Sequence, residues 1–182
     1  RRAPRSGSPE VYLFTPMVCR LLCMPILAAV DGSPGSKQVL TTASQLSEGL
    51  KEELHVIHVM SERRFEELMQ GDQLLETEWN VPYGNETDTG EEYSVEDAIV
   101  DSRNVADSIA AEALPEGATY EPIGAMGDPT SQILSHAEST DASFIVTGGR
   151  KRTKIGKVLF GSTSQSILLK ATRPIVTVMA EE

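Results

Sequence analysis

The sequence is poor in cysteine, in aromatic residues and in positive charge. Its 182 residues include two cysteines, and 5% are Phe, Trp or Tyr. Two cysteines cannot form the set of disulfides that holds small secreted domains together. There are 16 Lys and Arg against 27 Asp and Glu, a formal net charge of −11 at pH 7. Because phosphate backbones require a basic protein surface, this balance argues against a general nucleic-acid-binding protein.

Long apolar runs are missing as well. No stretch reaches the roughly 18 consecutive apolar residues of an ordinary transmembrane helix. The apolar content of 40% and the length of 182 residues suit one globular domain with a single core. The sequence therefore predicts a protein without a membrane span.

The segment before Met24 has the outline of a secretory signal, with Arg1, Arg2 and Arg5 preceding apolar residues. Cleavage near its end would remove residues 26–30, which read as the first strand of the domain. We therefore predict that the domain starts at Met24, and that residues 1–23 are a disordered leader or follow a wrongly assigned start. From Met24 onward, 12 basic and 26 acidic residues remain, a net charge of −14 over 159 residues. Such acidity suits a halophilic cytoplasm.

Strands and helices are predicted to alternate from Met24 to the end of the chain. Short apolar runs indicate buried parallel strands, and helical spacing marks the segments between them. Ser94 is predicted to cap one helix together with Asp97, and Asp128 to cap another that has Pro129 in its first turn. The expected strands are residues 26–30, 54–60, 119–123, 143–147 and 174–179. This pattern predicts an α/β fold, a five-stranded parallel sheet with helices on both faces, whose ligands bind at the carboxyl ends of the strands.

Residues 61–93 do not fit a simple crossover between strands. They begin with a charged helix at residues 62–69 and end in an acidic run. We interpret them as an acidic surface insertion. It could serve as a lid or docking loop that uses Trp79 and Tyr83, or it could be a solvated excursion without a role.

Residues 147–164 contain the residue types that are typical of a ligand-binding site. Gly148 and Gly149 are predicted to leave a strand and let a ligand approach the backbone. Gly161, followed by three hydroxyl residues, opens a helix whose free N–H groups suit an anion. Five of the basic residues lie between Arg150 and Lys157. Together these features predict a phosphate site.

Each feature also has an interpretation without a ligand. Ser162 and Gln165 have the spacing of a capping box, the glycines could form plain turns, and the basic run could be a solvated loop. A Walker A loop is excluded, because Gly156-Lys157 is followed by Val158. No nucleophile with a paired base is visible, so no catalytic residue is predicted. No metal site is predicted either, because Cys19 and Cys23 lack further ligands, and His55 and His58 point to opposite faces of a strand.

Several segments resemble the universal stress protein family. The segments that match the family are Met24-Pro-Ile-Leu-Ala-Ala-Val-Asp-Gly-Ser, Ile57-His-Val, the glycine motif from Gly148 to Ser164, and Pro174-Ile-Val-Thr-Val. The resemblance covers residues 24–182 except the insertion. It implies a Rossmann-like, adenine nucleotide alpha hydrolase-like sheet in the order 3-2-1-4-5, and a homodimer formed through the last strand.

The ATP-binding branch of this family implies a role for each matching residue. Asp31 would contact the ribose, although its alternative role is to start the following turn. The backbone of Val59 would contact adenine. Ribose and phosphates would be surrounded by the remaining residues of the predicted site, which are Gly148, Gly149, Arg150, Lys151, Gly161, Ser162, Thr163 and Ser164.

One departure from the family pattern bears on function. Lys151 stands where the second motif glycine is expected, which removes backbone freedom but adds a cation. The resemblance implies a cytoplasmic, dimeric stress-response sensor that binds ATP, with Mg²⁺ left open. The alternatives are a dimeric interaction module that binds no nucleotide, and a slow ATPase.

Overall fold

The computed structural model describes residues 24–69, 93–152 and 157–180. Within these ranges, strands and helices alternate as the sequence predicts. The strands are β1 (Ile26–Ala29), β2 (Leu54–Met60), β3 (Glu121–Met126), β4 (Phe144–Arg152), β5 (Lys157–Leu159) and β6 (Ile175–Ala180). The helices are α1 (Ser36–Leu50), α2 (Glu62–Met69), α3 (Val95–Ala113), α4 (Pro129–Ser139) and α5 (Ser162–Lys170).

Five of the strands form a parallel sheet. β1 pairs with β2 and β4, β2 also pairs with β3, and β4 also pairs with β6, all in parallel. Numbered without β5, the order is 3-2-1-4-5, which confirms the predicted topology. The central position of β1 explains its composition, because Ile26, Leu27 and Ala28 are fully buried.

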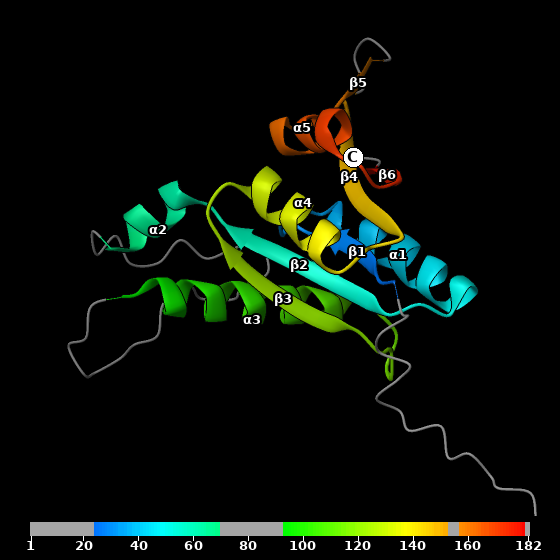
Figure 1. The fold of residues 1–182 in the computed structure, drawn as a ribbon, viewed down its shortest axis with the longest axis horizontal. Coiled ribbons are helices and arrows are strands. Elements are labelled where there is room, and N and C mark those ends of the chain that lie inside the picture. The colour runs from blue at the N-terminus through cyan, green and yellow to red at the C-terminus, as the bar shows by residue number, and fades with distance from the viewer. Residues whose placement is uncertain (1–23, 70–92, 153–156, 181–182) are drawn as a thin grey trace, which may run out of the picture.

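Helices cover both faces of this sheet, and Figure 1 shows α3 and α4 on opposite sides of β2 and β3. One core cluster packs α1 and α3 against residues such as Leu54 and Val56, and the other packs α4 and α5 against residues such as Leu27 and Ile57. The alternation along β2 thus divides its side chains between two cores.

Gly124 shows how closely α3 approaches the sheet. A Cβ at Gly124 would lie 2.0 Å from the carbonyl oxygen of Ile99 and 2.5 Å from the backbone nitrogen of Arg103. A glycine at this position of β3 lets the helix backbone lie directly on the strand.

The structure corrects several predicted boundaries. The third strand begins at Glu121 rather than residue 119 and ends at Met126 rather than residue 123. The fourth was predicted to end at Thr147, but β4 continues to Arg152, and its last three residues pair antiparallel with β5. Arg150 is aligned with Leu159 of β5 and with Ala180 of β6. A residue has one neighbour on each side in a sheet, so β5 lies on the β1 side of β4, beyond the end of β1.

The remaining predictions divide into two groups. The charged helix at residues 62–69 is confirmed as α2, whereas Trp79, Tyr83 and the proposed leader lie outside the described residues. Among the helices that the structure describes, none combines the length and apolar character needed to cross a membrane.

Candidate functional site

The carboxyl ends of β1, β2 and β4 meet at one edge of the sheet. Ala29 is aligned with Ile57, and Ala28 with Val146. Continued past the end of β1, the same registers align Asp31 with Val59 on one side and with Gly149 on the other. The backbone N–H of Val30 donates to the carbonyl of Ile57 at 3.0 Å, so the strands stay together up to this edge. Residues that are far apart in sequence thereby reach one place.

Asp31 organises the turn that follows β1. Its Oδ1 accepts a hydrogen bond from the backbone N–H of Ser33 at 3.0 Å and another from Ser36 Oγ at 3.3 Å. Gly32 has φ of +76°, which favours glycine. The turn-forming role of Asp31 is therefore present in the structure. The same turn holds the exposed carboxylate at the edge of the sheet.

His58, in β2, contacts the backbone at the end of β1. It is 7% exposed, and its Nδ1 lies 3.0 Å from the carbonyl oxygen of Val30. A carbonyl oxygen can only accept, so this contact assigns the ring hydrogen to Nδ1. Burial lowers the pKa of His58, while the hydrogen bond to Val30 and the charge of Asp31 act in the opposite direction. A neutral imidazole thus fixes the last residue before the Asp31 turn, a role that the sequence pattern did not reveal.

Gly148 and Gly149 lie within β4 rather than in a loop, which corrects the prediction. They pair with Val178 and Met179 of β6. A Cβ at Gly149 would lie 2.7 Å from Sδ of Met179, whereas one at Gly148 would make ordinary contact with Val39 at 3.5 Å. The absence of a side chain at Gly149 therefore lets the Met179 side chain pack against its backbone. Neither glycine has the positive φ of a turn.

The start of α5 also differs from its prediction. Gly161, not Ser162, is the N-cap, and no side chain caps the helix, so the Ser162–Gln165 capping box is absent. Ser164 Oγ instead donates to the carbonyl of Gly148 at 2.7 Å and lies 3.2 Å from Thr147 Oγ1. These contacts tie the first turn of α5 to the end of β4.

Gly161 is open on the side where a side chain would project. Its φ of −63° and ψ of 160° are extended values that any residue can adopt, and, its two chain neighbours aside, no atom of the residues that the structure describes lies within 4 Å of a Cβ built there. The uncapped N-terminus of α5 presents backbone N–H groups and a positive dipole end beside this open space.

The remaining predicted residues are placed as follows. Val59 is half-buried at the end of β2, and Thr163 is half-buried in the first turn of α5. The backbones of Arg150 and Lys151 belong to β4 and pair with Leu159 and Val158, while their side chains lie outside the described part of the structure. The geometry thus brings Asp31, Val59, the end of β4 and the first turn of α5 to one edge, where a carboxylate and helix N–H groups can contact hydroxyl and phosphate groups.

A second polar cluster escaped the sequence analysis. Glu53, His55 and Glu121 converge at the opposite, amino edge of the sheet. His55 and Glu121 are far apart in sequence and become neighbours only through the β2–β3 register. The cluster could have been predicted only if the register between these two strands had been known.

Comparisons with known proteins agree with this architecture. The profile of the Universal stress protein family matches residues 24–179. The Stress response protein NhaX of Bacillus subtilis is 28% identical over 162 residues, which cover 84% of this chain and 96% of the relative.

Solved structures show the same fold. A universal stress protein from Archaeoglobus fulgidus is 27% identical, with a TM-score of 0.54, over 85% of this chain and 97% of its own. The structure of the universal stress protein from Archaeoglobus fulgidus in complex with dAMP is 23% identical, with a TM-score of 0.50, over 85% of this chain and 96% of the other. The family profile, which spans almost all of the described fold, shows that this chain belongs to the universal stress protein family.

Proposed function

We propose that this chain binds an adenine nucleotide at the carboxyl edge of the sheet and acts as a dimeric, cytoplasmic sensor or regulator in a stress response. ATP is the expected nucleotide. The observation that carries the proposal is the convergence of Asp31, Val59 and the start of α5 at one edge. A universal stress protein from Archaeoglobus fulgidus in complex with dAMP supports an adenine nucleotide as the ligand.

Each group at this edge has a chemical role in the proposal. The Asp31 carboxylate accepts hydrogen bonds from ribose hydroxyls, and the end of β2 at Val59 offers backbone groups to the adenine edge. The N–H groups of Ser162, Thr163 and Ser164 bind phosphate oxygens, helped by the dipole of α5. Gly161 leaves room for the phosphates. Mg²⁺ would bind through the phosphates rather than in a cage of protein ligands.

Ligand-induced stabilisation tests the proposal. We expect the unfolding midpoint to rise when ATP and MgCl₂ are added, because a ligand at about 100 times its Kd adds roughly 2.7 kcal/mol. The Asp31→Asn variant keeps an oxygen that can accept from Ser33 and Ser36, but it loses the charge. We expect a normal midpoint without ligand and a weaker response to ATP. No shift at millimolar ATP, in salt that keeps the protein folded, would refute nucleotide binding.

A second candidate function is a dimeric interaction module without a nucleotide. The observation that favours it is the continuation of β4 through Gly148 and Gly149, where a phosphate loop was predicted. Lys151 in place of a motif glycine points the same way. Mass spectrometry of the native protein separates the two, because co-purified adenine nucleotide supports the first and a ligand-free dimer with no response to ATP supports the second.

A further inference from the structure

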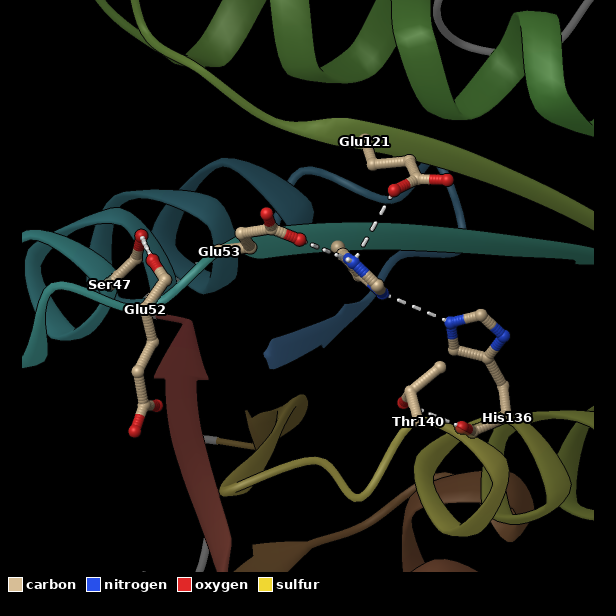
Figure 2. A network of polar contacts seen from close by, with 7 residues as sticks. Ser47, Glu52, Glu53, Glu121, His136 and Thr140 are labelled. Carbon is tan, nitrogen blue, oxygen red and sulfur yellow. Dashed lines mark hydrogen bonds and ion pairs between the residues drawn. The ribbon is translucent and has the colours of Figure 1, made fainter. Parts of the chain in front are cut away.

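The amino edge of the sheet holds a polar cluster that is separate from the proposed nucleotide site. Glu53 immediately precedes β2, His55 lies in β2, and Glu121 opens β3. Residues two apart in a strand share a face, and His55 is aligned with Glu121, so the three side chains project from the same face. Figure 2 shows the Glu53 and Glu121 carboxylates approaching one position from two sides.

His55 is the buried member of the cluster. Its side chain is 9% exposed, whereas those of Glu53 and Glu121 are 50% and 48% exposed. Its Nε2 is buried and has no hydrogen-bond partner among the residues that the structure describes. The nearest carboxylate oxygens are Glu121 Oε2 at 3.5 Å and Glu53 Oε2 at 3.8 Å. A buried polar nitrogen without a hydrogen bond is costly, and this one faces two anionic oxygens.

The other ring nitrogen of His55 already has a partner. Nδ1 of His55 lies 3.2 Å from Nε2 of His136, which comes from α4 (Figure 2). If Nδ1 donates to His136, then Nε2 of His55 carries a lone pair and points at the two carboxylates. This is the arrangement of a metal-binding histidine, whose second nitrogen donates to a neighbour that fixes its tautomer.

We propose that Glu53, His55 and Glu121 bind a divalent transition-metal ion, with Zn²⁺ as the expected metal. All three ligand atoms lie within 4.8 Å of one another. Ligands about 2.0 to 2.2 Å from a tetrahedral zinc ion lie roughly 3.4 Å apart, close to the two distances from His55 Nε2. One nitrogen and two carboxylate oxygens suit zinc, and water fills the fourth position on the exposed side.

The bound ion would join the starts of β2 and β3 and, through His136, α4. It would neutralise two carboxylates that otherwise face each other across a buried imidazole. The proposal does not depend on nucleotide binding, because its residues lie at the opposite edge of the sheet.

Zinc titration of the full chain tests this site. Cys19→Ser and Cys23→Ser are introduced first, since thiols also bind zinc. ZnCl₂ is then titrated by calorimetry in a large excess of MgCl₂, which suppresses weak binding to the acidic surface. We expect one zinc ion per chain. Glu121→Gln and Glu53→Gln should each weaken binding by about 10-fold or more, whereas Glu112→Gln, an exposed change on α3, should leave it unchanged.

Circular dichroism verifies that the two glutamine variants fold, which their exposed positions favour. Absence of zinc binding would overturn the proposal, and so would complete displacement of zinc by magnesium. Equal zinc affinity in wild type, Glu121→Gln and Glu53→Gln would also overturn it, because the ion would then sit elsewhere. In those cases the cluster is a histidine–carboxylate ion-pair group that needs no metal.

Discussion

Gly149 and Gly161 belong to the same glycine-rich segment, yet their surroundings differ. A Cβ at Gly149 would collide with Met179 at 2.7 Å, whereas one at Gly161 would meet no atom of the described part of the chain within 4 Å. The sequence pattern treats both as ligand-facing. The structure gives Gly149 a packing reason and leaves open space at Gly161, so Gly161 is the position at which binding can be tested without disturbing the fold.

Replacement of Gly161 by valine should separate binding from stability. The backbone at this position suits any residue, but Gly161 is the N-cap of α5 and valine is a weaker N-cap, so we expect the free energy of unfolding to fall by about 1 kcal/mol while the fold is kept. The valine side chain would fill the space proposed for phosphate, and we expect ATP affinity to fall by about 100-fold or more. Calorimetric titration with ATP measures this effect.

Gly49→Val is the matched control, because a Cβ at Gly49 in α1 also meets nothing within 4 Å. This variant should bind ATP like wild type. Wild-type affinity in Gly161→Val as well would show that phosphate does not pass this glycine, and it would favour the interaction-module function.

His58 should make stability depend on pH. Burial lowers its pKa in the folded protein, so below the unfolded value of about 6.5 the unfolded chain binds more protons. The free energy of unfolding should therefore fall as the pH drops from 7.5 to 5.5, although the hydrogen bond to Val30 and the charge of Asp31 offset part of the loss. His58→Asn keeps a donor near Val30 but cannot titrate, so its stability should fall less over this range.

Denaturant melts at several pH values check this prediction. His136, whose pKa is also lowered by burial, contributes in the same direction in both proteins and cancels in the comparison. Identical pH profiles for wild type and His58→Asn would mean that His58 does not contribute.

At the scale of elements, the sequence predicts where a helix begins when a side chain caps its N-terminus. Ser94 forms the predicted capping box with Asp97, and Asp128 caps α4 by accepting from the N–H of Ser131. The hydroxyls of Ser94 and Ser131, followed by their backbone N–H groups, donate to these two carboxylates and lower the pKa of Asp97 and of Asp128. Ser162 has the same sequence signature but stands one residue inside α5. In this first turn, the Ser164 hydroxyl instead donates to the carbonyl of Gly148 in β4.

Two alanine variants compare these helix starts. Ser94→Ala should cost about 1 kcal/mol of unfolding free energy, because it removes an N-cap. Ser162→Ala should cost less than about 0.5 kcal/mol, because no cap is lost. Urea unfolding of both variants measures the difference. A loss of about 1 kcal/mol in Ser162→Ala would show that the serine caps α5 in solution.

At the scale of the whole molecule, β6 is the last strand on one side of the parallel sheet. Among the described strands it pairs with β4 alone. Its neighbour α5 exposes Leu168 and Leu169, at 39% and 80%. An open edge strand invites pairing with another chain, and pairing with its own copy closes a two-fold assembly.

We therefore predict a homodimer formed through β6. Light scattering should give about twice the chain mass of 19.7 kDa at micromolar concentrations. Hydrogen exchange should protect β6 amides at high concentration and lose that protection on dilution. A mass of one chain throughout the concentration series would contradict the dimer.

Beyond the sheet order, which came from the family resemblance, the sequence by itself determined the succession of strands and helices along the chain and two helix caps. These features depend on local patterns, since apolar runs, helical spacing and capping residues act within a few positions. It could not determine where β4 ends, because the residues after Thr147 stay extended only through pairing with β5 and β6. Tertiary structure also decided the contact between His58 and Val30, the packing of Met179 on Gly149, and the cluster of Glu53, His55 and Glu121. Each joins segments that only the strand register brings together, and no local pattern encodes that register.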